Sequence, residues 1–181
     1  KMIKFVYQNV PKGTGDAVLK TKRFITDKYF LMLLPDDLII KKNCSKSMIN
    51  VHQKYKSSVM ASMQVNKSTV SRWGIYNLSK RLSKSDYLIS DVVEKPSIKD
   101  APSNKAVIGR YILPKTIFKK LKNQNSGNGG EIHITDAIQS LIKDNENFIA
   151  HNFSGKYLDC GTMNGYINSG KKISNLWNYA W

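Results

Sequence analysis

Residues 29–40, with the sequence YFLMLLPDDLII, constrain the fold more than any other stretch of the chain. An unbroken apolar and aromatic run leads into Pro35, and Asp36 and Asp37 follow at once. A short apolar run closed by a proline predicts a strand over 29–35 that is buried on both faces. Two unpaired carboxylates are costly inside a core, so we expect both at the strand's end, in a crevice. Because ligands of open α/β sheets bind outside the carboxyl ends of strands, the stretch predicts the metal end of a phosphate-handling site.

Length and composition favour one domain over residues 1–181, large enough to bury a core. The chain is 41% hydrophobic and 23% charged, which is ordinary for a soluble globular protein. Cys44 and Cys160 lie far apart without a CxxC pairing, so neither a zinc site nor a disulfide framework is expected, and a reduced, cytoplasmic setting fits. No apolar stretch approaches the roughly 20 residues of a membrane span, and no signal-peptide pattern opens the chain.

The formal net charge of +16 is the strongest anomaly in the composition. Such a charge is compatible with nucleic-acid binding. The lysines are nevertheless spread evenly, without the dense run or interleaved aromatic residues of a dedicated nucleic-acid reader. We therefore expect the charge to attract small anionic substrates, and nucleic-acid binding remains the less favoured alternative.

Turn residues and hydrophobic periodicity predict alternating strands and helices, as in a single α/β layer protein. A strand over 3–8, a glycine loop, a helix capped by Asp16 and the strand over 29–35 would form one βαβ unit. Ser45 or Ser47 is expected to open the next helix. The later elements are predicted as strands over 58–65, 74–78, 86–96, 106–113, 148–153 and 155–159, and helices over 114–122, with Pro114 as the first residue, and 135–143. A long C-terminal helix is expected to have an apolar stripe made of Met163, Ile167, Gly170, Ile173, Trp177 and Ala180.

Two groups of residues have the chemistry of a ligand site. The glycines of PKGTG, at 11–15, allow close approach of a flat or anionic ligand, but this is neither GxGxxG nor GxxxxGK[ST], and a plain turn is the commoner meaning. Asp159 also closes a short extended run, so with Asp36 it could hold one Mg²⁺ ion. For each aspartate, helix capping or turn formation is the alternative.

Glu94 and Lys95, in VVEKP, are adjacent at a strand end. A carboxylate that accepts sugar hydroxyls beside a lysine that contacts phosphate would explain the pair, and a solvated strand end is the plainer alternative. The three histidines, His52, His133 and His151, have no spacing typical of a metal site or a catalytic triad. We expect them to be ordinary surface or core residues.

A series of short motifs adds up to a specific resemblance. PKGTGDAV, LLPDD, SRWGI, VEKP, APSNKAVIGRYIL, GGEIHITDAI and YLDCGT occur in this order. Each motif alone is weak, but seven in order and spacing are strong. Over essentially all of its length the chain resembles the bacterial UTP–glucose-1-phosphate uridylyltransferases, or UDP-glucose pyrophosphorylases, of the sugar-phosphate nucleotidylyltransferase family. The resemblance implies a Rossmann-like mixed β-sheet flanked by helices.

The resemblance also implies roles for residues on the nucleotide side. Gln8 and Gly13 match residues that meet the uracil ring, with the Gly13 backbone giving the close approach. Asp36 and Asp159 match the two metal-binding aspartates. Asp37 is expected as a supporting neighbour in the substrate site.

On the sugar side, Gly74 matches a glycine that lies against the hexose. Glu94 matches the residue that accepts sugar hydroxyls, and Lys95 matches the lysine on the sugar phosphate. Trp73 and His133 stand where the family pattern usually has tyrosine and glutamine, and neither change touches an expected essential contact.

The implied reaction is attack of a glucose 1-phosphate oxygen on the α-phosphorus of UTP, giving UDP-glucose and pyrophosphate. The nucleophile is already an anion, so catalysis would consist of positioning and charge neutralisation. Mg²⁺ on Asp36 and Asp159 would offset the repulsion between the substrates, and Lys95 would hold the attacking phosphate. Asp36 and Lys95 are therefore the expected catalytic residues.

One family element has no counterpart in this sequence. The family opens with a glycine-rich loop of the type GxGTRxxPxTKxxPK, which wraps the triphosphate, and nothing similar occurs here. We expect an N-terminally truncated member that keeps much of the sugar half of the site but has little or no transferase activity alone. Apolar surface left uncovered would favour a homo-oligomer or aggregation. A transferase for another nucleotide or sugar, and a non-catalytic basic fragment that binds nucleic acid, remain as alternatives.

Overall fold

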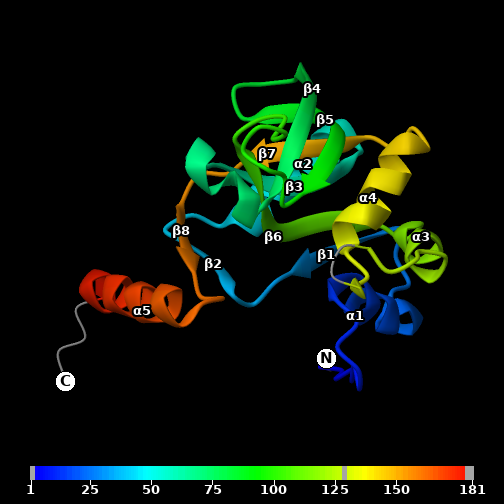
Figure 1. Ribbon diagram of the computed structural model, residues 1–181, viewed down its shortest axis with the longest axis horizontal. Helices are drawn as coiled ribbons and strands as arrows, with labels where there is room; N and C mark the ends of the chain where they lie inside the picture. The colour runs from blue at the N-terminus through cyan, green and yellow to red at the C-terminus, as the bar shows by residue number, and fades with distance from the viewer. Residues whose placement is uncertain (1–2, 128–129, 178–181) are drawn as a thin grey trace.

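The computed structural model describes residues 3–127 and 130–177, and its centre is a six-stranded mixed sheet (Figure 1). The strand order is β1-β6-β3-β7-β5-β4, and β4 also touches β6 through the pair Ile75–Ala106. Strands β3 and β7 are parallel, and the other neighbours are antiparallel. A separate two-stranded ribbon pairs β2 with β8. The strands are β1 (Tyr29–Leu33), β2 (Asp37–Ile40), β3 (Ser58–Gln64), β4 (Gly74–Arg81), β5 (Asp86–Glu94), β6 (Lys105–Pro114), β7 (Phe148–Asn152) and β8 (Lys156–Asp159).

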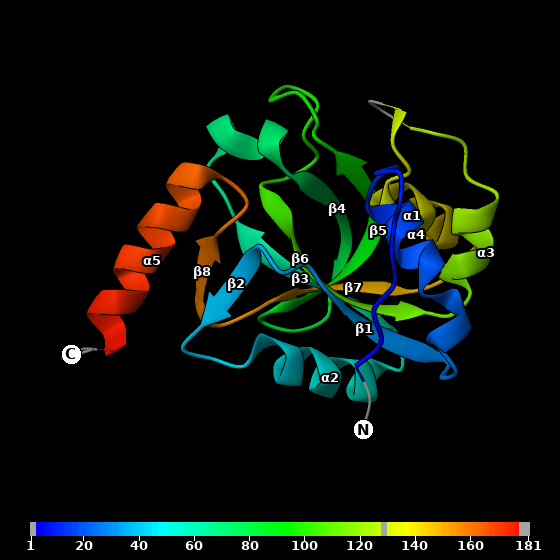
Figure 2. The same cartoon turned by 90° about the horizontal axis from the view of Figure 1, so that it is seen from below.

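Helices cover both faces of the sheet. Figure 2 shows α1, α3 and α4 together on one side and α2 on the other, while α5 stands apart beside β8. No helix in the described part of the chain is long and apolar enough to cross a membrane. The helices are α1 (Thr14–Lys20), α2 (Cys44–Tyr55), α3 (Ile117–Lys122), α4 (Ile134–Lys143) and α5 (Met163–Trp177), with short 3₁₀ turns η1 (Lys22–Phe24) and η2 (Lys67–Arg72).

Strand β6 forms the centre of the core because its side chains alternate between two apolar clusters. Tyr111 and Leu113 join the cluster under α1, α3 and α4. Ile108 and Ile112 join the cluster under α2. The β6 sequence AVIGRYIL is mostly apolar on both faces, which is the pattern of a strand covered on both sides.

The strand predicted over residues 29–35 forms, but its expected burial on both faces is wrong. Strand β1 ends at Leu33 and occupies the edge of the sheet, where its side chains are half-buried and Leu33 is 49% exposed. An apolar run indicates a strand but does not say whether another strand lies on each side of it. Asp36 and Asp37 do follow the end of the strand, as predicted.

The predicted βαβ unit is also wrong. Residues 3–8 form no strand, and β1 runs antiparallel to β6 rather than parallel to a preceding strand. Asp16 does not cap α1, because Gly13 occupies that position. Asp16 is buried in the first turn instead, where it accepts a hydrogen bond from Gln8 Nε2 at 2.7 Å.

Two other predicted details differ at element ends. Helix α2 is capped by Asn43, whose Oδ1 accepts from Lys46 N at 2.9 Å, and not by Ser45 or Ser47. Pro114 ends β6 rather than opening the following helix. The β4–β5 hairpin, by contrast, is confirmed by its antiparallel register.

The apolar stripe predicted for the last helix lies on α5, but it faces outward. Met163 is 76% exposed and Ile167 is 47% exposed. Helix α5 meets β8 through a polar contact, in which buried Ser169 Oγ donates to Asp159 O at 2.9 Å. The Trp177 side chain and Ala180 lie outside the described residues.

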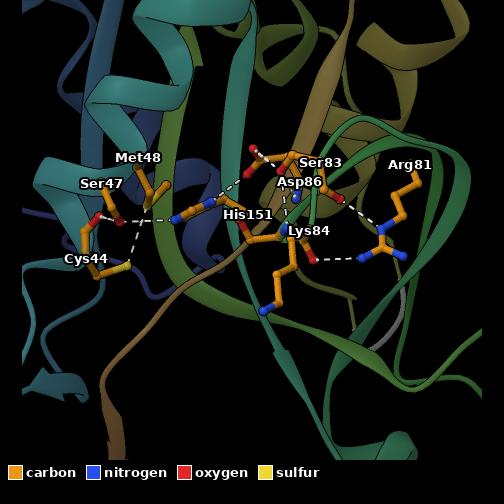
Figure 3. Close-up of polar contacts among 9 residues, drawn as sticks. Cys44, Ser47, Met48, Arg81, Ser83, Lys84, Asp86 and His151 are labelled. Atoms are coloured by element: carbon orange, nitrogen blue, oxygen red, sulfur yellow. Dashed lines mark hydrogen bonds and ion pairs between the residues drawn. The ribbon is translucent and has the colours of Figure 1, made fainter.

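Helix α2 is fastened to the sheet by a buried polar network (Figure 3). His151, on β7, contacts Asp86 Oδ1 through Nδ1 at 2.7 Å and Ser47 Oγ through Nε2 at 3.1 Å. Ser83 Oγ donates to the other Asp86 oxygen at 2.7 Å. Ser47, His151 and Asp86 are hydrogen-bonded in the order of a hydrolase triad. The Ser47 hydroxyl, however, donates to Cys44 O within the helix rather than to the histidine. The network therefore has a structural role, in which it connects α2, β7 and β5.

Candidate functional site

The β2–β8 ribbon brings the predicted aspartates together. Asp37 is the first residue of β2 and lies directly opposite Asp159, the last residue of β8. The Cys160 N–H donates to Asp36 O at 2.8 Å, which holds the chain around Asp36 against the turn after β8. Distant parts of the sequence thus meet at one end of the ribbon, and this acidic end contains Asp36, Asp37 and Asp159.

The Asp36 and Asp159 carboxylates converge on the backbone at Gly161. A Cβ atom added to Gly161 would lie 2.9 Å from Asp36 Oδ2 and 3.5 Å from Asp159 Oδ1. The Gly161 N–H also donates to Asp159 Oδ1 at 2.9 Å. Only glycine leaves this space open, so two carboxylates face one small gap. Arg72, from η2, approaches Asp159 Oδ2 at 3.5 Å and places a positive charge beside it.

Asp37 points into the protein, unlike its neighbour. Its Oδ2 accepts from the Gly109 N–H at 2.6 Å, and its Oδ1 accepts from the Tyr157 hydroxyl. Burial raises the pKa of Asp37 above its ordinary value, although these two hydrogen bonds act in the opposite direction. Asp37 therefore supports the ribbon and the strand end, and it is poorly placed to bind an ion itself.

The end of the β4–β5 hairpin brings together the residues predicted for the sugar side. Gly74 and Glu94 are directly paired across the two strands, and a Cβ on Gly74 would lie 3.2 Å from Glu94 Oε2. Thr135 Oγ1, at the start of α4, donates to the same oxygen at 3.1 Å. Lys95 follows with a left-handed backbone (φ 45°), and its N–H donates to Trp73 O at 3.0 Å. The turn fixes where the lysine side chain begins.

The glycine loop is held against the segment that precedes α4. Gly13 has φ 98°, and a Cβ there would lie 2.8 Å from Ile132 O, so another residue would clash. The Gly15 N–H donates to Ile132 O at 2.7 Å, and the Ile132 N–H donates to Lys12 O at 2.8 Å. Gln8 Nε2 donates to Gly13 O at 3.1 Å, so the two residues predicted for the base lie in contact.

Tyr111 stands between the two groups of acidic residues. It is 4% exposed, on the face of β6 that points toward α4. Its pKa is raised by burial and by the charges of Asp37, Glu94 and Asp36. A second link runs through Trp73, whose ring lies 5.9 Å from that of Tyr157. Trp73 therefore links the turn at Lys95 to the β2–β8 ribbon, which brings the two groups of site residues into one region.

Four residues around this region were not singled out from the sequence: Arg72, Tyr111, Thr135 and Tyr157. All four lie inside the quoted motifs SRWGI, APSNKAVIGRYIL, GGEIHITDAI and YLDCGT, whose order gave the signal. Tyr157 precedes Leu158 and Asp159 at the end of a short strand, and nothing local predicts its contact with Asp37. These four supply hydrogen bonds, charge and ring contacts to the predicted residues.

The acidic end fits a divalent ion that retains water. Among residues 3–127 and 130–177, no three His, Cys, Asp or Glu side chains are grouped as a complete metal site. Two carboxylates that converge over Gly161 nevertheless suit a divalent cation that keeps several waters and takes phosphate oxygens as further ligands. Asp36 and Asp159 are the residues that would hold it.

Comparison with known proteins identifies the class: residues 2–175 match the nucleotidyl transferase family, to which the chain belongs. It is 37% identical over 169 residues to the putative UTP–glucose-1-phosphate uridylyltransferase of Methanocaldococcus jannaschii, covering 93% of this chain and 59% of that protein. It is 38% identical over 168 residues to the UTP–glucose-1-phosphate uridylyltransferase of Pseudomonas aeruginosa, covering 91% and 60%. The chain thus spans about three fifths of the length of these curated relatives.

A solved structure gives the same result for the fold. A UDP-glucose pyrophosphorylase complexed with UDP-glucose superimposes with a TM-score of 0.90 and 39% sequence identity, covering 96% of this chain and 66% of that one. The mixed α/β nucleotidyltransferase fold expected from the motifs is therefore confirmed.

Proposed function

We propose that the chain forms the sugar-phosphate side of a UTP–glucose-1-phosphate uridylyltransferase, which makes UDP-glucose and pyrophosphate from UTP and glucose 1-phosphate. The observation that supports this most directly is the convergence of Asp36 and Asp159 over Gly161. The paired Gly74 and Glu94 on the same region add a surface for a hexose. The names of the relatives support the choice of substrates.

Each residue has a task in this proposal. Glu94, oriented by Thr135, accepts hydroxyl groups of the sugar, and Gly74 leaves room for the ring. Lys95 binds the sugar phosphate and orients its oxygen for in-line attack. Gly13 and Gln8 receive the uracil ring. Enzymes of this kind work with a divalent ion, and Asp36 and Asp159 would hold Mg²⁺, whose charge offsets the repulsion between the two anionic substrates.

The proposal extends to the setting of the protein. Cys44 and Cys160 are free thiols, which suits the cytoplasm. Exposed apolar side chains on α5 suit a homo-oligomer. A transferase for another nucleotide or sugar is the nearest alternative, because the base and the hexose are each met by few residues.

Calorimetric titration of the chain with UDP-glucose in the presence of Mg²⁺ tests this function. We expect saturable binding that weakens by about 10-fold or more in Asp36→Asn and in Lys95→Ala, since each change removes a charge-assisted contact. Gly161→Ala should weaken binding as well, because its methyl group displaces the Asp36 carboxylate.

Asp100→Asn is the matched control, since Asp100 is an exposed carboxylate in the loop after β5 whose partner is Ser97. Its binding should equal that of the unaltered chain. Equal affinity in all four variants would refute the assigned site. Salt-sensitive binding to arbitrary DNA, unaffected by these substitutions, would instead support the nucleic-acid alternative.

A further inference from the structure

A polar cavity lies on the opposite side of the sheet from Glu94 and Tyr111. It has a volume of about 460 Å³ and is bounded by the edge of β1, the end of β2 and the first turn of α2. In Figure 2 the connection from β2 to α2 runs along the side of the sheet away from α1, α3 and α4. None of the residues assigned to the sugar or the nucleotide lines it.

Arg110 forms the inner wall of this cavity and is 8% exposed. It follows Gly109 on β6 and points to the α2 side, whereas the next residue, Tyr111, points to the other. Its Nη1 donates to Leu34 O at 2.7 Å and to Gly109 O at 2.8 Å, and its Nη2 donates to Asp37 O.

All three of these acceptors are neutral carbonyl oxygens. Within the part of the chain that the structure describes, Arg110 forms no ion pair with a carboxylate. The Asp37 carboxylate lies beyond ion-pair distance, although the guanidinium still acts to lower the pKa of Asp37. An anion in the adjoining cavity would give this buried guanidinium a closer opposite charge.

The rest of the cavity wall adds to the positive potential. Lys41 and Lys42 lie exposed at its rim, and no acidic residue lines it. Burial raises the pKa of Cys44 to about 11, although nearby Arg110 acts against this, so at neutral pH the thiol is uncharged. The 12-residue helix α2 begins at Cys44, and its first residues line the cavity, so its N-terminal dipole adds to the positive potential there.

We propose that this cavity binds a small phosphate-bearing anion, held by Arg110 from inside and by Lys41 and Lys42 from the rim. The Arg110 guanidinium also donates to the carbonyl of Asp37, the neighbour of Asp36. An anion that binds Arg110 would therefore alter a hydrogen bond that helps to position Asp36. The inference rests on the cavity and its charges, and it holds whatever reaction the acidic site performs.

An NMR titration with inorganic pyrophosphate tests the proposal. The isotopically labelled chain is titrated in metal-free buffer at constant ionic strength, and the shifts of its backbone amide signals are measured. Metal-free buffer keeps the Asp36–Asp159 pair from recruiting the anion through a cation. We expect saturable shifts at Lys42, Ser45 and Gly109, with Gly161 unchanged.

The double variant Lys41→Ala, Lys42→Ala should bind at least about 10-fold more weakly, because each lost contact is charge-assisted. Both lysines are exposed, so the variant should fold. Lys80→Ala is the control, since this exposed lysine lies on β4, the last strand in the sheet order that begins with β1. Arg110→Lys should also weaken binding, since lysine lacks the planar fork. Shifts spread evenly over the lysine-rich surface, or equal loss in Lys80→Ala, would overturn the proposal.

Discussion

At the scale of single residues, Asp37 is both a neighbour of the predicted metal ligand Asp36 and a residue that holds strands together. Its carboxylate accepts from Gly109 and Tyr157, and its carbonyl accepts from Arg110. These contacts join the start of β2 to β6 and β8. Burial nevertheless dominates, and the pKa of Asp37 lies above its ordinary value. The ionised carboxylate is therefore tolerated in this position rather than favoured by it.

This pKa direction predicts a pH dependence. A carboxyl with a raised folded-state pKa binds its proton more tightly in the folded chain, so its contribution to stability is present at acid pH and lost as pH rises through the folded pKa. The free energy of unfolding of the unaltered chain, relative to Asp37→Asn, should therefore fall between about pH 4 and neutrality. Urea unfolding of both proteins across this range measures the difference, and a constant or rising difference would contradict the assignment.

The position of Asp36 and Asp37 after a strand could be predicted because Pro35 interrupts an apolar run. Their partners could not be predicted from local sequence. Tyr157 reaches Asp37 only because β2 and β8 pair, and Gly109 does so only because β1 lies beside β6. Such contacts depend on strand pairing across long separations, whereas hydrophobic periodicity reports on neighbours along the chain.

At the scale of elements, the strongest sequence signals described hairpins and helices, and the weakest described the order of strands. The β4–β5 hairpin followed from alternation that ends at Pro96. Residues 3–8 are also predicted as a strand, yet they form none. The apolar run of β1 suggested a central strand, a place that belongs to β3 and its neighbours. In both cases, whether the segment forms a strand and where that strand lies depend on pairing with a strand far away in the sequence.

Helix α2 offers a test of how one element is anchored. Replacing His151 with alanine leaves the Asp86 carboxylate, 5% exposed, without its main partner and frees Ser47 from β7. We expect a loss of about 3 kcal/mol in the free energy of unfolding, as for other broken buried polar pairs. Ser47→Ala should cost only about 1 kcal/mol, since it leaves the histidine–aspartate pair intact. Chemical denaturation compares the two, and equal losses would show that the network is not centred on His151.

At the scale of the whole molecule, two surface properties oppose each other. The net charge of +16 keeps chains apart through repulsion. Large apolar side chains are exposed at the same time, with Ile3 at 84%, Phe5 at 80% and Tyr7 at 83% along one extended segment. Salt screens the repulsion but does not weaken apolar contacts.

We therefore predict that the chain self-associates more strongly as salt rises. Sedimentation velocity at low and high salt should show a shift to larger species, and Phe5→Ser with Tyr7→Ser should reduce that shift. Ile98→Ser is the control, because Ile98 is 58% exposed but lies in the loop after β5, away from the extended segment. A salt-independent monomer would refute the prediction and the homo-oligomer proposed above.

The parallel pairing of β3 with β7 also sets the order in which this fold can assemble. β3 lies between β6 and β7, so neither of its neighbours is next to it in sequence. During synthesis β3 leaves the ribosome long before β7 exists, and a nascent chain that ends after β6 has one edge of β3 open to other strands. The middle of the sheet is complete only after residues 148–152 have been synthesised and have paired with β3. Folding is therefore slow and late, and until then the open edge of β3 must be kept from pairing with other chains.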